Sequence, residues 1–142
     1  MAARGRAEWK GDLKGGSGTF EAGDSGIAGD FSFTTRFEDA PGANPEQLIG
    51  AALASCFSMA VSNALSQGGN VPESVRTEAV VSIGKIGDAT SITRIDVKTV
   101  GKVPGIDQAA FEKVAEEMKT GCIVSRALAG VPEFTLTATL ED

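Results

Sequence analysis

The two cysteines, Cys56 and Cys122, are the strongest candidates for reactive residues, because the chain of 142 residues contains no histidine. Without an imidazole there is no Ser–His–Asp triad, no Cys–His protease pair and no zinc site that depends on histidine. Neither cysteine has a partner at metal-ligand spacing, so we expect the protein to bind no metal and no other cofactor. A cation that activates either thiol must therefore be a lysine or an arginine.

Two charged residues that precede Cys56, namely Arg36 and Glu46, could assist a thiol. An adjacent guanidinium favours the reactive thiolate, and its fixed donors can hold a thiolate on one edge and a carboxylate on the other. A second thiol able to reach the first would allow a catalytic disulfide cycle. Each residue also has an ordinary interpretation: both cysteines as packing residues, Arg36 as a solvated strand residue, and Glu46 as a first-turn acid that favours the helix dipole.

Cys56 lies in a long helix that the sequence predicts from Pro45 to about Gln67. Asn44 and Gln47 have the spacing of a capping box around Pro45, which suits the first helical position. No charge and no proline occur from Leu48 to Leu65, which is typical of a helix buried on all sides. The residues expected to flank the thiol are Ile49, Ala52, Leu53, Met59 and Ala60. A ridge of small residues lies on the other side and would allow close approach of another helix: Gly50, Ala54, Ser58 and Ser62.

The remaining periodicities predict a single α+β domain over residues 1–142, in which sheets surround this central helix. Alternation of polar and apolar residues predicts two short strands over 4–12 and 17–21 and a third strand over 31–38. A long antiparallel hairpin is expected over 75–83 and 95–100, and a last strand over 134–140. Asp107 should cap an amphipathic helix that ends at Gly121, and residues 123–128 could form one further turn.

Composition and charge exclude several classes of protein. The net charge is −6 and 42% of the residues are apolar, so we expect a globular core and no binding to nucleic acid. The N-terminal segment of residues 1–10 lacks the apolar run of a signal peptide. Polar side chains such as Ser55 and Asn63 interrupt the central helix and argue against a membrane span. The sequence therefore predicts a soluble, cytoplasmic protein.

Three segments together resemble the OsmC/Ohr family, the osmotically inducible protein C and organic hydroperoxide resistance proteins, which are cysteine-based peroxidases. The segments are Thr35 to Ile49 with its Asn-Pro-Glu start, the run Ala54-Ser55-Cys56-Phe57-Ser58-Met59-Ala60, and Cys122 to Leu128. The chain is more similar to the OsmC branch, because its Arg-Phe-Glu element directly precedes the central helix.

The resemblance implies a stress-response peroxidase that reduces organic hydroperoxides and, less efficiently, hydrogen peroxide. It implies Cys56 as the peroxidatic thiol, Cys122 as its resolving partner in a disulfide, and Arg36 with Glu46 as the polar pair. It also implies an intertwined homodimer with antiparallel sheets wrapped around long central helices. The expected reductant is an external dithiol, such as a lipoylated protein.

Three positions depart from the family pattern: Leu53 stands where the OsmC branch often has histidine, Ile123 where proline is usual, and Arg126 where lysine is usual. We expect a more apolar pocket and a looser turn after Cys122. Two other functions stay open for the same residues. One is a module that binds a small hydrophobic ligand with its thiols merely buried, and the other is thiol–disulfide exchange without peroxide chemistry.

Helix geometry favours a site shared between two chains. Glu46 and Cys56 are about 15 Å apart along the axis of one helix and roughly 80° apart around it. A glutamate side chain cannot span that distance unless Arg36 itself bridges much of it. Convergence of Arg36, Glu46 and Cys56 is therefore easier across a two-fold axis, with residues from two chains.

Overall fold

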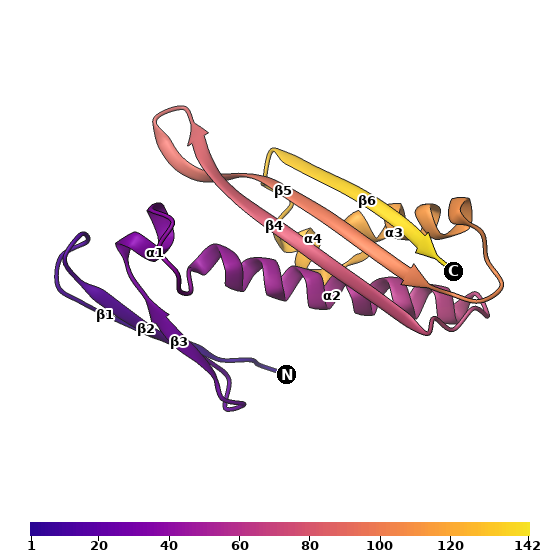
Figure 1. The fold of residues 1–142 in the computed structure, drawn as a ribbon, viewed down its shortest axis with the longest axis horizontal. Coiled ribbons are helices and arrows are strands. Elements are labelled where there is room, and N and C mark those ends of the chain that lie inside the picture. The colour runs from indigo at the N-terminus through magenta and orange to yellow at the C-terminus, as the bar shows by residue number, and fades with distance from the viewer. The chain divides into compact units, whose positions relative to one another are not determined.

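The computed structural model describes residues 1–142, and its elements follow the order three strands, two helices, two strands, two helices and a strand (Figure 1). This is the α+β class that the sequence predicts. The elements form two compact units, Met1–Leu48 and Ile49–Asp142. Helix α2 (Pro45–Gln67) begins in the first unit and continues through the second.

The first unit contains a three-stranded antiparallel sheet of β1 (Gly5–Lys10), β2 (Ser17–Ala22) and β3 (Ile27–Phe31), in that order. Aromatic packing supports this sheet, because the rings of Trp9 and Phe31 lie with their centroids 5.5 Å apart. The first two strands agree with the strands predicted over 4–12 and 17–21.

The strand predicted over residues 31–38 is wrong, because β3 ends at Phe31 and a short helix, α1 (Phe33–Phe37), follows it. A capping box starts this helix: the amide of Thr35 donates to the Ser32 hydroxyl at 3.3 Å, and the amide of Ser32 donates to the Thr35 hydroxyl at 2.9 Å. Phe33 and Phe37 are four residues apart, so their rings pack together on one side of the helix, tilted by 43° with their centroids 5.1 Å apart. The phenylalanine spacing therefore fits a helix as well as a strand.

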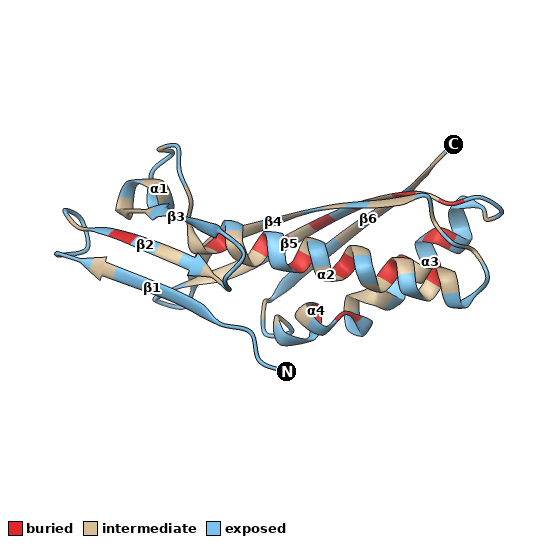
Figure 2. Ribbon diagram, turned by 90° about the horizontal axis from the view of Figure 1, so that it is seen from below, coloured by how far each residue is buried: buried red, intermediate tan, exposed pale blue.

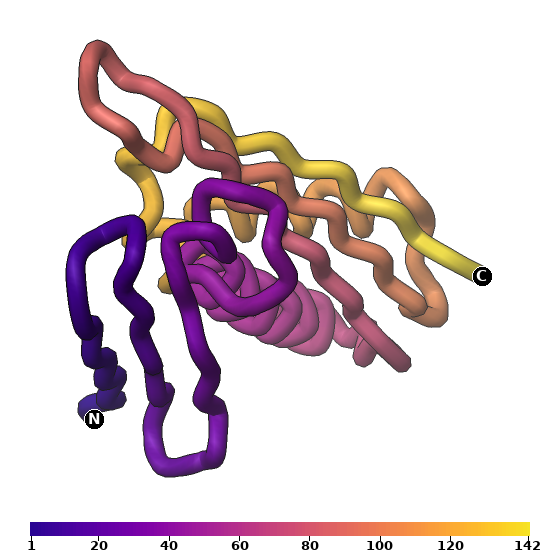
Figure 3. The backbone as a smooth tube through the Cα atoms, turned by 60° about the vertical axis from the view of Figure 1, so that its left-hand side comes forward, coloured from indigo at the N-terminus to yellow at the C-terminus, as the bar shows by residue number.

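The second unit places helices on one face of a three-stranded sheet in the order β4 (Ser74–Ile86), β5 (Ala89–Lys102) and β6 (Glu133–Glu141). Strands β4 and β5 form the predicted long antiparallel hairpin, whose course is clear in Figure 3. Strand β6 pairs with β5 in parallel, which differs from the purely antiparallel sheets that we expect from the sequence. The parallel pairing is possible because α3 (Gln108–Gly121) and α4 (Ile123–Ala127) carry the chain back to the start of the sheet.

The core of the second unit lies between this sheet and the helices α2 and α3. Helix α2 contributes fully or nearly fully buried side chains at every fourth residue, and the pattern is visible along the helix in Figure 2. The buried apolar cluster consists of Leu53, Phe57, Val61, Leu65, Ile95, Val97, Val103, Phe111 and Cys122. Asp107 caps α3 as predicted, because its carboxylate accepts a hydrogen bond from the amide of Ala110 at 2.9 Å.

The small-residue ridge of α2 contacts strand β4 and not another helix. A Cβ atom added at Gly50 would lie 2.8 Å from the carbonyl oxygen of Ala79. Further along the ridge, the Ser58 hydroxyl donates to Thr77 Oγ1 at 2.8 Å. The close approach predicted from the small residues is therefore confirmed, but the expected helical partner is wrong, because the strand occupies that place.

The other side of α2 is exposed in the single chain, so the prediction of a helix buried on all sides is wrong for this side. The exposed positions recur at helical spacing and carry no charge: Ala51, Ala52, Ser55, Met59 and Asn63. Met59 is largely open to solvent, at 73% of its maximal exposure. By length and composition alone α2 could cross a membrane, a property that core helices of soluble proteins share.

Candidate active site

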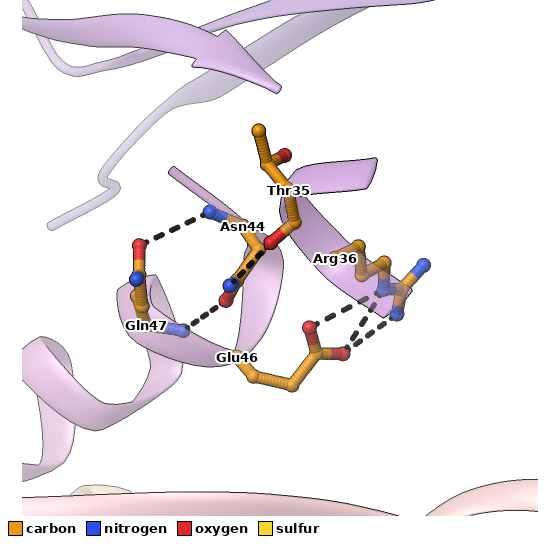
Figure 4. A network of polar contacts seen from close by, with 5 residues as sticks. All are labelled: Thr35, Arg36, Asn44, Glu46 and Gln47. Atoms are coloured by element: carbon orange, nitrogen blue, oxygen red, sulfur yellow. Dashed lines mark hydrogen bonds and ion pairs between the residues drawn. The ribbon is translucent and has the colours of Figure 1, made fainter. Parts of the chain in front are cut away.

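The first unit brings Arg36 and Glu46 together (Figure 4). Arg36 Nη2 lies 2.7 Å from Glu46 Oε1, and Arg36 Nε donates to both carboxylate oxygens at 3.2 and 3.3 Å. The Glu46 residue is only 7% exposed, whereas the Arg36 side chain is 39% exposed. The buried carboxylate therefore anchors a guanidinium whose outer part still meets solvent.

Local backbone chemistry places these two charges. Asn44 donates from Nδ2 to the carbonyl oxygen of Thr35 at 3.0 Å, which ties the end of α1 to the start of α2. The predicted capping box is confirmed, because the amide of Gln47 donates to Asn44 Oδ1 at 2.9 Å and the amide of Asn44 donates to Gln47 Oε1 at 3.2 Å. Arg36 and Glu46 are thus each next to a residue fixed by this network (Figure 4).

The geometry of the pair leaves donor capacity unused. Glu46 engages Nε and Nη2 of Arg36 but not Nη1, so that nitrogen is free to donate to an anion. The guanidinium also lies over the ring of Phe37, with Cζ 5.2 Å from the ring centroid, which further restricts its orientation. A fixed, partly exposed arginine of this kind suits the stabilisation of a thiolate or an alkoxide.

The second unit brings Cys56 and Cys122 together. Cys56 lies on α2 and is partly exposed, and Cys122 lies between α3 and α4 and is 1% exposed. Both are free thiols, and Cys56 packs against the buried cluster that contains Cys122. Residues that are far apart in the sequence are therefore adjacent because α2 and the α3–α4 connection pack on the same core.

Cys122 has a distinct electrostatic environment at the N-cap of α4. Burial, the largest single influence, raises the pKa of its thiol, whereas the nearby Cys56 thiol, the amide and hydroxyl of Ser125 and the amide of Val124 lower it. Together these polar groups outweigh burial, so the pKa of Cys122 lies below its ordinary value. Ile123 takes the first position of α4 with its side chain in solvent, and the turn forms without a proline.

The structure thus joins the four predicted site residues into two pairs, each inside one compact unit. Sequence reasoning did not single out Ser125, whose hydroxyl is buried without a hydrogen-bond partner. Its signal was the spacing, since the residue three positions after an N-cap lies beside it. No group of three or more His, Cys, Asp or Glu residues is close enough together to hold a metal ion.

A mainly apolar cavity of about 390 Å³ opens in the first unit, and none of the four candidate residues lines it. Its walls come from β1, β2, the end of β3 and the start of α2, and include Phe20, Phe31 and Leu48. Neither Arg36 nor Glu46 contributes to its walls, so this cavity is distinct from the ion pair of the same unit.

Comparison with known proteins gives one family model and related sequences. The model of the OsmC-like protein family matches residues 37–137. The chain is 44% identical to the peroxiredoxin OsmC of Escherichia coli (strain K12) over 141 residues, which cover 98% of this chain and 96% of that protein. It is 32% identical to the organic hydroperoxide resistance protein of Xanthomonas axonopodis pv. citri (strain 306) over 97 residues, which cover 68% of this chain and 66% of that protein.

Solved structures share the fold at lower sequence identity. An OsmC-like protein of unknown function from Vibrio cholerae superposes with a TM-score of 0.76 at 18% identity, over 97% of this chain and 99% of that one. At this identity the likeness concerns the fold alone.

Proposed function

This chain belongs to the OsmC-like protein family, and on that premise we propose that it reduces organic hydroperoxides with Cys56 and Cys122 as redox-active thiols. The resemblance that the sequence predicts is confirmed, and the OsmC relative is more similar to the chain than the organic hydroperoxide resistance relative. The protein is a peroxidase of the peroxiredoxin type. The observation that carries the cysteine mechanism is the packing of Cys56 against the buried cluster that contains Cys122.

In the oxidative half of the cycle, the Cys56 thiolate attacks the terminal oxygen of the hydroperoxide. The O–O bond breaks, Cys56 becomes a sulfenic acid, and the alkoxide leaves and is protonated to the alcohol. Cys122 then attacks the sulfenic sulfur, so that a disulfide forms and water leaves. The difference in burial supports this order, because a peroxide can reach the partly exposed Cys56 more easily than the buried Cys122.

Arg36 and Glu46 serve this step electrostatically. Glu46 holds the guanidinium in place, and the donors of Arg36 that Glu46 leaves free stabilise the thiolate and the departing alkoxide. The pair meets Cys56 in a homodimer whose active sites combine residues of two chains. An external dithiol, such as the dihydrolipoyl group of a lipoylated protein, reduces the disulfide, and the protein works in the cytoplasm. Organic hydroperoxides are better substrates than hydrogen peroxide.

Rapid mixing of the fully reduced protein with cumene hydroperoxide tests the proposal. We expect two thiols to be lost per chain and one equivalent of alcohol to appear, at least about a thousandfold faster than with free cysteine. Cys56→Ser should not react. Cys122→Ser should lose one thiol and accumulate a sulfenic acid that dimedone traps.

A reaction no faster than that of free cysteine would contradict the proposal and favour a module that binds an apolar ligand. Normal turnover of Cys122→Ser with a dithiol would remove Cys122 from the mechanism. Loss of both thiols with a disulfide substrate but not with a peroxide would indicate thiol–disulfide exchange.

A further inference from the structure

Ser125 is the buried polar side chain that the mechanism above does not use. It lies on α4, three residues after the N-cap Cys122, and it is 4% exposed. Its hydroxyl oxygen is inaccessible to solvent and has no hydrogen-bond partner of regular geometry while both cysteines are thiols. A buried hydroxyl without a partner destabilises the fold, so this arrangement needs a reason.

The first turn of α4 places Ser125 beside Cys122, because the residue three positions after an N-cap is its neighbour on that turn, and both residues are buried. The Ser125 hydroxyl and the amides of Val124 and Ser125 also lower the pKa of the Cys122 thiol. A neutral sulfur is a weak hydrogen-bond acceptor, whereas a thiolate is a charged and much stronger one. The hydroxyl therefore gains its partner when Cys122 carries a negative charge.

We propose that Ser125 is a catalytic residue of the reductive half-reaction, in which its hydroxyl donates a hydrogen bond to the Cys122 sulfur as that sulfur leaves the disulfide. Only the existence of the Cys56–Cys122 disulfide is taken from the proposed function. The unpartnered, buried hydroxyl three residues after Cys122 supports this role, and the polar groups around Cys122 hold the pKa of its thiol below the ordinary value, which favours it as a leaving group.

Exposure decides which sulfur the reductant attacks. Cys56 is partly exposed and Cys122 is buried, so one thiolate of an external dithiol attacks Cys56 Sγ. A bond forms between the reductant and Cys56, the Cys56–Cys122 bond breaks, and its electron pair goes to Cys122 Sγ beside Ser125. The second thiol of the reductant then attacks its own sulfur bonded to Cys56, which releases Cys56 and leaves the reductant as a cyclic disulfide. Two electrons and two protons pass from the dithiol to the protein.

The test uses a disulfide made chemically, by diamide oxidation of the full-length protein. A monothiol, 2-mercaptoethanol, is added briefly, the reaction is quenched with N-ethylmaleimide, and peptides are mapped by mass spectrometry. We expect 2-mercaptoethanol on Cys56 and N-ethylmaleimide on Cys122. Reduction by dithiothreitol should be about fivefold slower or more in Ser125→Ala and unchanged in the matched control Ser62→Ala, a partly buried serine on α2.

A second pair of proteins separates a leaving-group effect from damage to the fold. In the Cys122→Ser background, Cys56 is converted to its mixed disulfide with 2-mercaptoethanol, so that the small thiol is the leaving group. Ser125→Ala should not change the rate at which dithiothreitol reduces this mixed disulfide.

Four results would overturn the proposal: monothiol found on Cys122, no slowing in Ser125→Ala, equal slowing in both backgrounds, or failure of diamide to join the two cysteines. A protein that fails to react with peroxide but passes these tests would contradict the proposed function and leave the role of Ser125 intact.

Discussion

At the scale of single residues, the two cysteines differ in surroundings although they belong to the same packed core. Cys56 is partly exposed on a helix, whereas Cys122 is buried at the N-cap of α4, where the polar groups of Val124 and Ser125 lower the pKa of its thiol. The first environment suits attack on a substrate that arrives from solvent. The second suits a sulfur that must accept negative charge without solvent. The roles proposed for Cys56 and Cys122 follow from this asymmetry.

Arg36 offers a prediction at the same scale, because its guanidinium serves Glu46 with two nitrogens and still has donors left. In Arg36→Lys, one ammonium cannot keep this double contact and also reach an anion. We expect the rate of peroxide reduction to fall roughly tenfold to a hundredfold, with little change in thermal stability, measured by rapid mixing and calorimetry.

The matched control is Arg76→Lys. Arg76 also uses two nitrogens to bind a carboxylate, that of Glu141, at 2.9 and 3.0 Å, and this pair is exposed on the sheet of the second unit. Equal losses of activity in the two variants would argue against a role for Arg36 in the reaction.

At the scale of elements, one side of α2 must approach strand β4 closely, and another must pack into the core. Gly50 and Ser58 allow it to approach β4, and the buried residues between them join the core. The close approach positions Cys56 relative to the sheet and to Cys122, all within the second unit. Helix placement and thiol placement therefore depend on the same small side chains.

Gly50→Ala should lower the free energy of unfolding by about 1–3 kcal/mol, since the new methyl group would lie 2.8 Å from the backbone oxygen of Ala79, which cannot rotate away. Urea unfolding measures the change. Alanine favours a helix more than glycine does, so helix propensity alone would raise the free energy of unfolding. A decrease would therefore report the clash with Ala79.

Gly121→Ala on α3 is the control, because a Cβ there would meet mainly the flexible end of Met118. If Gly50→Ala is as stable as the parent protein, the contact between α2 and β4 is looser than the structure indicates.

At the scale of the whole molecule, the exposed side of α2 is the strongest reason to expect a dimer. An exposed helix face normally carries charges, but this one has none, and Met59 stands at its middle. A second copy of the chain that covers this side by a two-fold interface would bury it and repeat the contact symmetrically. The homodimer that the sequence predicts would then have α2 at its interface.

Met59→Lys should therefore convert a dimer into monomers in sedimentation velocity and reduce peroxidase activity, because a charge would be buried at the interface. Val71→Lys, at another exposed apolar position outside α2, should leave the dimer intact. A parent protein that sediments as an active monomer would defeat the prediction.

Mixing chains extends this test to the active site. If Arg36 and Cys56 come from different chains, subunit exchange between Arg36→Ala and Cys56→Ser should restore activity through the one intact site of the heterodimer. If a verified heterodimer shows no activity, Arg36 and Cys56 of one active site come from the same chain.

The sequence by itself determined the features that depend on neighbours along the chain. The capping box of Asn44 and Gln47, the Asp107 cap and the β4–β5 hairpin arise from hydrogen bonds and periodicity within a few residues, so local patterns predict them. The absence of histidine likewise limited the chemistry to thiols before any fold was known.

Only the tertiary structure decided which partners these elements meet. Phe33 and Phe37 satisfy a strand or a helix equally in sequence, and the structure has a helix there, which a hydrogen bond from Asn44 to the carbonyl oxygen of Thr35 ties to the start of α2. The contact of Gly50 with β4, the parallel pairing of β6 and the adjacency of Cys56 and Cys122 join distant segments. Such contacts depend on which apolar surfaces are buried against each other. That burial involves residues from the whole core, so no short stretch of sequence determines it.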